Sequence, residues 1–443
     1  MRPGCRGGLS GSGPVPPRHT PHRDPVEIPM WKLLRSNALF RRLFLGEAFS
    51  SFGDSAMFLS LAIWAKDLTG SDAAAGIVFL IITAPGLTAP LLGHLVDRVQ
   101  RRPLLLRMYF GMAVLVPSLL LVRGAGQLWI IYLVTLAYGL VFATPARQAL
   151  LKDLLPSDDA VAARSLLITT REGVRIVSPV AGAGVYAAFG GGALAYLGSA
   201  TFLVAGFVLL SVRVVESEPE PAGEPLRRAL PAGFRFVLGV PLLRRLTLAM
   251  VGFLGVVGLL ETAAFAAVDQ GLGRQPEFIG VMASVQGGGS VVGGVLAGLL
   301  VKRVGEARSS GAGYALVSAG LVLCVSQHTA LFLVGAALIG TGLPFVAVAI
   351  GTASHLYAPA RMQGRVNSAV STLTDTAQTM SIAAGAALIV LVDYRVMYGA
   401  MALSAVACAL AVALRPAAVP PVAPSVADEG PPPADAPGGR GSP

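Results

Sequence analysis

The chain has 443 residues, of which 54% are hydrophobic and only 13% are charged, and its formal net charge is +10. So little polar surface excludes an assembly of ordinary soluble domains and indicates an integral membrane protein. The basic residues fall in short connectors between apolar stretches, so the positive charge predicts membrane topology rather than nucleic-acid binding.

The two ends of the chain differ from the rest in composition. Residues 1–29 are rich in proline, glycine and arginine, and residues 415–443 are rich in proline and alanine. We expect both segments to be disordered because they hold too little apolar surface to form a core. The residues Met30-Trp31-Lys32-Leu33-Leu34 are typical of a protein N-terminus, and we hypothesise that translation begins at Met30.

Between these tails the chain contains twelve apolar segments long enough to cross a bilayer. They lie at about 43–65, 75–96, 104–122, 127–149, 162–188, 192–212, 245–268, 277–301, 311–327, 329–352, 366–392 and 395–414. The longest connector separates the sixth from the seventh. The predicted fold is therefore an all-α membrane protein with twelve transmembrane helices in two pseudo-symmetric six-helix bundles, residues 30–212 and 245–414. The cytoplasmic linker, 213–244, is expected to hold a short surface helix around 227–240.

The two halves repeat each other weakly. Gly93-His94-Leu95-Val96-Asp97-Arg98 returns 205 positions later as Gly298-Leu299-Leu300-Val301-Lys302-Arg303. At an offset of 203 the matching pairs are Pro156 and Pro359, Glu172 and Asp375, and Gly182 and Gly385. Such repetition is typical of transporters built from duplicated bundles, which hold the substrate between the halves near mid-membrane.

Orientation follows from the basic residues. Of the 34 Lys and Arg, only Lys66, Arg123, Arg274 and Arg395 lie in the connectors that alternate with the strongly basic ones. Since basic connectors stay in the cytoplasm, both termini are predicted to be cytoplasmic.

A dense group of charges lies between the second and third segments. Asp97, Arg98, Arg101 and Arg102 follow Gly93, whose missing side chain allows two helices to approach closely. We expect these residues, with Asp153 as a partner of Arg98 or Arg102 and with Lys302 and Arg303 as the repeated copy, to form a cytoplasmic gate. A basic loop that only holds topology through anionic lipid is the alternative, but it leaves Asp97 and Gly93 unexplained.

Acids inside spanning segments are costly and usually face a cavity or a partner. Asp54 in the first segment is the strongest candidate for proton exchange, with Glu47 two turns earlier. Glu261 in the seventh and Asp375 in the eleventh segment are the other candidates. Phe52, Met57 and Phe58 would surround Asp54 with apolar groups. The alternative for Asp54 is a structural hydrogen bond to a neighbouring helix.

The fifth segment combines charges with a bend. Arg171 and Arg175 share one helical face, and Glu172 is within pairing distance of Arg175, which suits a gate or a structural ion pair. Downstream, Pro179 removes a backbone hydrogen bond and Gly182 permits close packing. The alternative is that these are simple packing residues of a Gly- and Ala-rich helix. The glycines from 287 to 298 predict that the eighth segment packs closely against another helix.

Three of these motifs resemble a known family. Gly-x-Leu-x-Asp-Arg-x-x-Arg-Arg at 93–102 resembles the signature loop of the major facilitator superfamily, departing from it at Gln100. The Ser-x-x-Gly-Asp stretch at 50–54 resembles the first helix of its drug, macrolide and siderophore exporter branch. Ser178-Pro179-Val180-Ala181-Gly182-Ala183 resembles the fifth-helix signature of antiporters.

This resemblance implies a secondary transporter that exports an amphipathic organic molecule in exchange for protons by alternating access. Proton symport of a small metabolite into the cell is the alternative within transport. A polytopic membrane enzyme would need a His/Asp or carboxylate cluster at a membrane face, which we do not find, and a sensor or scaffold would tolerate loss of the intramembrane acids.

The expected partners are a small-molecule substrate, protons and the lipid bilayer, without nucleic acid, and the protein is expected to be a monomer. The three cysteines and five histidines show no metal-site spacing, so neither a metal nor a cofactor is predicted. The expected location is the plasma membrane of a bacterium.

Overall fold

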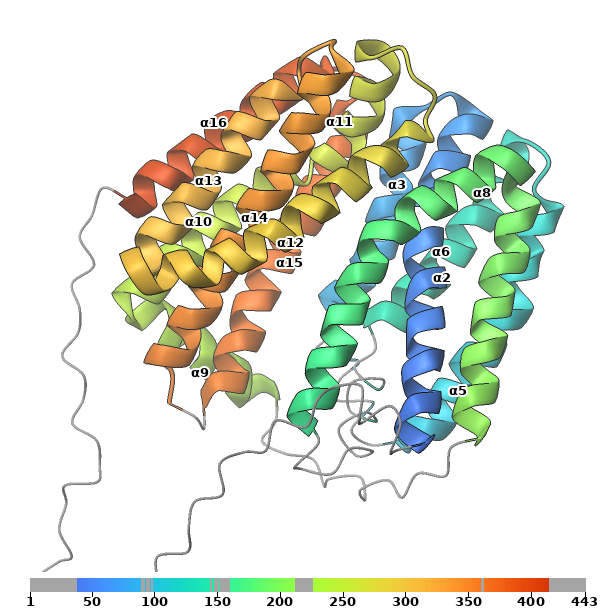
Figure 1. The fold of residues 1–443 in the computed structure, drawn as a ribbon, viewed down its shortest axis with the longest axis horizontal. Helices are drawn as coiled ribbons and strands as arrows, with labels where there is room; N and C mark the ends of the chain where they lie inside the picture. Colours follow the sequence, from blue (N-terminus) through green and yellow to red (C-terminus); the bar gives the residue numbers. More distant parts are fainter. Residues whose placement is uncertain are drawn as a thin grey trace, which may run out of the picture.

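The computed structural model describes residues 38–88, 92, 96, 99–143, 146, 150, 160–211, 226–359 and 362–413. Within these residues the chain is helical and contains no β-strand. The described residues of each of the twelve expected segments lie mainly in a helix or in consecutive helical pieces, and Figure 1 shows the helices gathered into two halves. The predicted fold class is confirmed.

The N-terminal half contains the first six segments. Its elements are α2 (Ala38–Thr69), α3 (Asp72–Thr83) with the 3-10 turn η1 (Ala84–Thr88), α5 (Arg101–Leu115) with η2 (Val116–Leu121), η3 (Ala125–Gln127) with α6 (Leu128–Ala143), and α8 (Ala160–Ser211). Pro85 lies in η1 and Pro117 in η2. A proline lacks the amide that continues an α-helix, which accounts for the tighter turns at both places.

The long element α8 is two spanning helices separated by a turn at Gly190. Gly190 has a φ of 73°, a conformation that glycine adopts without steric cost. The next residue, Gly191, leaves room for the indole ring of the buried Trp64, since an added Cβ would lie 2.2 Å from that ring. The two glycines therefore let the chain reverse against α2.

The C-terminal half contains the other six segments. The seventh is made of α10 (Pro241–Val257), α11 (Leu260–Ala266) and the π-turn η4 (Ala267–Gly271), and it is followed by α12 (Phe278–Val304), α13 (Glu306–Leu323), α14 (Thr329–Tyr357), α15 (Gln363–Leu388) and α16 (Tyr394–Ala413). The glycines of α12 do pack closely: a Cβ at Gly289 or Gly293 would meet the backbone of α14 at Ala337 or Thr341. The close packing predicted for this segment is confirmed.

The linker helix α9 (Leu226–Gly239) lies where a surface helix was expected. Its buried Val237 packs with Val366 and Ala369 of α15, and Gly233 lies against the carbonyl of Arg365. This helix is therefore attached to the C-terminal half.

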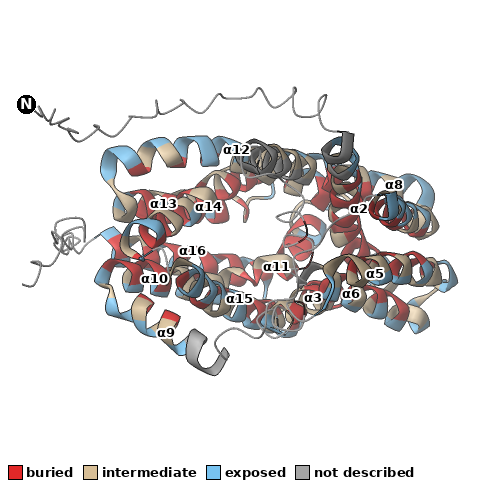
Figure 2. Cartoon of the chain, turned by 90° about the horizontal axis from the view of Figure 1, so that it is seen from below, coloured by how far each residue is buried: buried red, intermediate tan, exposed pale blue. Residues whose placement is uncertain are grey.

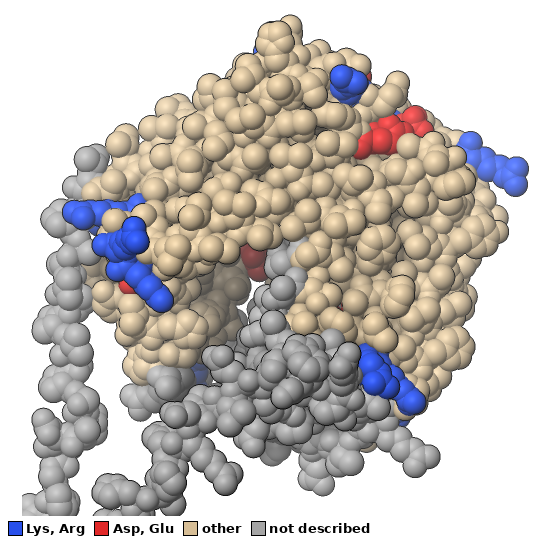
Figure 3. All heavy atoms as spheres, viewed as in Figure 1, with Lys and Arg blue, Asp and Glu red and all other residues tan. Residues whose placement is uncertain are grey.

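The surface suits a lipid environment. Seven of the described helices are long and apolar enough to cross a membrane. Large apolar side chains point outward, including Val114, Phe189 and Leu391, which are 81, 76 and 82% exposed. Figure 2 shows the buried residues inside each half and the exposed ones on the outer faces, and Figure 3 shows the Lys, Arg, Asp and Glu side chains of one face near helix ends, apart from an acidic side chain in the hollow between the halves.

The two halves meet at two crossings, α8 with α12, and α3 with α15 and α11. Small residues lie at both crossings. A Cβ on Gly280 of α12 would meet Ala183 and the carbonyl of Pro179 in α8, and a Cβ on Gly76 of α3 would meet Thr262 and Ala386. Ser284 of α12 also donates a hydrogen bond of 2.5 Å to the carbonyl of Ile176 in α8.

Candidate functional site

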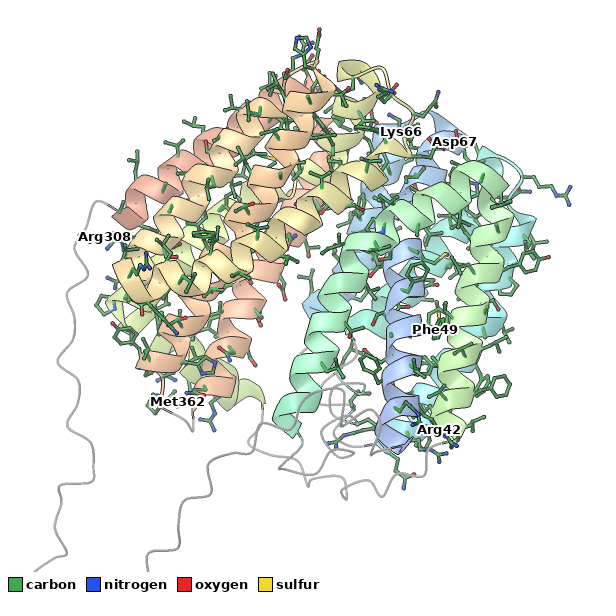
Figure 4. The ribbon with its side chains drawn as sticks, in the orientation of Figure 1. Arg42, Phe49, Lys66, Asp67, Arg308 and Met362 are labelled. Atoms are coloured by element: carbon green, nitrogen blue, oxygen red, sulfur yellow. The ribbon has the colours of Figure 1, made fainter. Side chains whose placement is uncertain are left out.

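The space between the two halves is the candidate functional site. The halves lie together at the end of the molecule that carries Lys66, here called the Lys66 end, and diverge toward the end that carries Arg42 and Met362, here called the Arg42 end (Figures 1 and 4). Near the Lys66 end the rings of Phe79 and Phe265, one from each half, have centroids 6.2 Å apart. Figure 3 shows that the described atoms leave a hollow between the halves on the Arg42 side.

Helix α15 borders this space and has a polar face. Gly364, Ser368, Ser371 and Asp375 are exposed and follow each other at spacings of three or four residues, so they share one side of the helix. Polar side chains are unfavourable against hydrocarbon, so this side must face water in a membrane. The structure thus places Asp375, a predicted site residue, on a polar stripe of α15.

Asp54 lies inside the N-terminal half, not against lipid. Its side chain is 5% exposed, and the hydroxyl of Ser50 lies 3.4 Å from its Oδ2. The preceding residue, Gly53, packs against Thr201 of α8, so α2 closely approaches the sixth segment here. Of the apolar neighbours predicted for Asp54, Met57 is fully buried, whereas Phe52 and Phe58 are half-buried.

Tyr138 of α6 completes the surroundings of Asp54. It is 1% exposed, its ring packs 5.2 Å from that of Phe202, and its hydroxyl lies at Gly198 beside the sulfur of Met57, three residues after Asp54. Sequence reasoning did not select Tyr138. A tyrosine in the middle of an apolar segment was the available signal, because a buried hydroxyl needs a polar neighbour.

Glu47 and Glu261 are both half-buried. Glu261 is in the first turn of α11, directly after the break between α10 and α11. Gly258 at this break lies against Ser381 and the carbonyl of Gln378 in α15, which explains why a side chain is missing there. A broken helix beside an acid is a recurring feature of transporter binding sites.

Lys66 joins the two halves. Its Nζ lies 2.5 Å from Oδ1 of Asp72, at the start of α3, and 2.9 Å from Oδ2 of Asp269, on η4 of the other half. Lys66 is 4% exposed, Asp72 12% and Asp269 55%. Neither this lysine nor Asp269 was predicted as a site residue.

Local structure explains where Lys66 and Asp72 lie. Gly70, with a φ of 67°, ends α2, and the side chain of Ser71 caps α3. A cation in the last turn of one helix and an acid in the first turn of the next both complement the helix dipoles. The neighbouring Asp67 accepts a hydrogen bond of 2.7 Å from Tyr186 of α8, within the same half.

The predicted residues of the fifth segment are only partly described. Pro179 and Gly182 lie in α8, and Gly182 is at the crossing with α2, where a Cβ would lie 2.6 Å from the carbonyl of Ala56. The side chains of Arg171, Glu172 and Arg175 fall outside the described part of the structure. Their role as a gate or ion pair stays a prediction.

The predicted gate residues are described at four positions. Arg102 binds the carbonyls of Leu209 and Leu210 at the end of α8, at 3.3 and 3.1 Å, so it ties two helices of one half together. Arg101 is half-buried, and Lys302 and Arg303 are exposed in the last turn of α12. Gly93, Asp97, Arg98 and Asp153 lie outside the described residues.

Comparisons with known proteins agree on one family. The family model described as Major Facilitator Superfamily matches residues 43–273 and 262–438. The chain is 24% identical over 373 residues to an uncharacterized MFS-type transporter, YfiS of Bacillus subtilis (strain 168), covering 80% of this chain and 88% of that protein.

Solved structures share the fold. A bacterial homologue of the iron transporter ferroportin, in an inward-facing state, superimposes with a TM-score of 0.65 at 16% identity and covers 85% of this chain and 98% of its own. The nucleoside transporter NupG has a TM-score of 0.67 at 13% identity, and the match covers 84% of this chain and 98% of that protein. The POT family transporter PepTSo has a TM-score of 0.66 at 14% identity and covers 85 and 97%.

The chain belongs to the major facilitator superfamily. It is a secondary transporter and not an enzyme, it is embedded in a membrane through many helices, and a small molecule is its substrate. In the described residues no three His, Cys, Asp or Glu side chains are grouped as a metal site.

Proposed function

We propose that this protein exports an amphipathic organic molecule, of the drug, macrolide or siderophore kind, in exchange for protons. The two halves rock about their contacts, so that the space between them opens to one side of the membrane at a time. The observation that carries the proposal is the position of two acids. Asp54 is buried beside Ser50 in the N-terminal half, and Asp375 is exposed on the polar stripe of α15.

Asp54 is the proposed proton carrier. A buried carboxylate without water is costly in its charged form, so a small change in hydration as the halves move changes its affinity for a proton. Ser50 donates to the carboxylate, and a serine hydroxyl can also accept from the protonated acid, so the group can be held in either charge state. Glu47, Glu261 and Asp375 are proposed to assist in proton transfer or substrate binding.

An amphipathic substrate fits the two kinds of surface beside the space. The stripe on α15 offers hydroxyls and a carboxylate, whereas the rings of Phe79 and Phe265, buried against each other in this state, become available only when the Lys66 end opens. The proton supplies the difference in affinity between the two open states that drives uphill export.

The proposal includes an orientation and a gate. Both termini and the Arg42 end face the cytoplasm of a bacterial cell, and the Lys66 end faces outward. When the Arg42 side closes, the Asp97 and Arg98 loop and its copy at Lys302 and Arg303 hold that mouth shut. The units are a bundle at 30–212, a linker at 213–244 and a bundle at 245–414, acting as a monomer.

The experiment has two stages. Growth of cells with and without the protein is first compared over a panel of antibiotics, dyes and siderophores to find a compound it removes. Uptake of that compound is then measured in inverted vesicles with an acidified or a neutral interior. An exporter accumulates it only when the interior is acid. Equal uptake in both vesicles would contradict proton exchange, and loss of uptake on acidification would favour symport.

A further inference from the structure

The ion pair between Lys66 and Asp269 joins equivalent places of the two halves. The two residues are 203 positions apart, which is the offset at which the halves repeat. Two positions related by a twofold rotation can touch only near the rotation axis. The pair therefore lies at the pseudo-twofold axis, where the halves meet at the Lys66 end.

At the axis, charged residues in these two places can bind each other only if their charges are opposite. Two lysines or two aspartates in these places would face each other at about 3 Å and repel, because like charges this close are unfavourable even in water. A lysine in one half and an aspartate in the other attract instead. The duplicated halves thus have opposite charges at these two equivalent positions, whose side chains meet.

Asp72 binds the same lysine from within the N-terminal half. Its Oδ1 is 2.5 Å from Nζ, and Asp72 and Lys66 are connected through the short turn at Gly70. The two carboxylates repel each other across the lysine. Asp72 belongs to the same half as Lys66 and Asp269 to the other, so a separation of the halves at this end would break only the bond to Asp269.

We propose that Lys66 and Asp269 form the lock that closes the Lys66 end, and that Asp72 sets how easily this lock opens. In the closed state the lysine binds both acids. In the open state Asp269 is hydrated and Asp72 remains as the counterion of Lys66. Asp72 favours opening because it keeps the largely buried lysine paired throughout and competes with Asp269 for it.

This assignment gives two acids on one lysine opposite roles. Asp269→Asn weakens the bond between the halves and shifts the protein toward the state that is open at the Lys66 end. Asp72→Asn removes the counterion of the open state and the repulsion of the closed state, so it shifts the protein toward closure. If the three residues were only a structural ion-pair cluster, both substitutions would shift the equilibrium between the closed and open states in the same direction.

Asp67 provides a matched control. It is next to Lys66 in α2, but its carboxylate binds Tyr186 of the same half. Asp67→Asn makes the same chemical change at the same end of the molecule without touching a bond between the halves. It should leave the opening equilibrium unchanged.

The test measures the distance between spin labels on the two halves in purified full-length protein in lipid vesicles. Ala125 and Gln327, exposed in connectors at the Lys66 end, carry the labels after the native cysteines are replaced. Asp269→Asn is expected to raise the population at long distances, Asp72→Asn to lower it, and Asp67→Asn to leave it as in the unsubstituted chain. The proposal is overturned if Asp269→Asn causes no shift, or if both Lys66 partners shift the distances in the same direction.

The inference rests on the proposed alternating access, but the two fail differently. If the labelled protein shows two distances and none of the three substitutions changes their populations, the proposed lock is contradicted but alternating access is not. If one distance persists in every variant and with every transported compound, alternating access itself is wrong. Melting temperatures of the three variants in detergent identify a variant that has not folded, and the charge-exchanged pair Lys66→Asp with Asp269→Lys then replaces it. The protein with both changes should populate the short distances, which report a closed Lys66 end, more than the protein with Lys66→Asp alone.

Discussion

Gly182 and Gly385 occupy the same place in the two halves of this transporter. A Cβ on Gly182 would lie 2.9 Å from the Cα of Ala56, and a Cβ on Gly385 would lie 3.1 Å from the Cα of Leu259. Ala56 and Leu259 are themselves 203 positions apart, as the two glycines are. The fifth segment of each half therefore crosses the first segment of that half through a glycine, and the weak internal repeat of the sequence is a repeat of packing.

The crossing at Gly182 can be tested by overpacking. Gly182→Ala should destabilise the protein by about 1–3 kcal/mol, the usual cost of extra atoms in a tight contact, because both the Ala56 carbonyl and Ser60 lie within 3 Å of the new Cβ. Gly184→Ala, two residues on, has nothing within 4 Å and is the control. Thermal unfolding in detergent should show a lower Tm for the first variant only. Equal Tm values would contradict a close crossing.

Ser284 should bias the conformation through its hydrogen bond to Ile176, which crosses between the halves. Removing such a bond usually costs about 0.5–1.5 kcal/mol. Ser284→Ala should therefore lower the population of the state described here and raise that of states in which the halves are arranged differently. Distances between spin labels on the two halves measure these populations. Ser318→Ala, which loses a 3.0 Å bond to Ala402 within one half, should leave those distances unchanged. The same change in both variants would count against a bond specific to the interface.

Asp54 should be essential for proton exchange. Asp54→Asn keeps the size of the side chain and can still accept from Ser50, but it cannot gain or lose a proton near neutral pH. We expect loss of proton-driven transport with little change in the amount of folded protein. Asp67→Asn, in the same helix, is the control and should transport normally. Unchanged transport by Asp54→Asn would remove this acid from the mechanism.

Asp375 should matter for substrate or proton transfer because it lies on the polar stripe of α15. Asp375→Asn is expected to raise the substrate concentration needed for half-maximal transport, or to weaken the dependence of transport on pH. Asp393→Asn, in the connector between α15 and α16, changes an acid outside the space between the halves. If the two variants behave alike in transport assays over a range of pH, the stripe has no special role.

Much of the fold could be predicted because the length of an apolar segment can be read from consecutive residues. The twelve segments, the surface helix in the linker and the glycine packing of α12 all follow from residues that are neighbours in sequence. Even α15, with its serines and Asp375, was predicted as a helical segment from the apolar residues around them.

The candidate site was less predictable, because its contacts join distant residues. Lys66 was counted only as a basic residue in a connector, although the offset of 203 already placed it opposite Asp269. Tyr138 lies far from Asp54 in sequence, and no pattern in α6 indicates which helix its hydroxyl faces. Arg102 was assigned to a gate from a family signature, while its described bonds go to the end of α8.

The most direct test of the central claim measures protons. Inverted vesicles with an acid interior are loaded with a pH-sensitive dye, and a compound found to be exported is added outside. The account predicts that the compound causes proton release from vesicles containing the unsubstituted protein, and none from vesicles containing Asp54→Asn. Transport of the compound without proton release, or equal release by the two proteins, would contradict it.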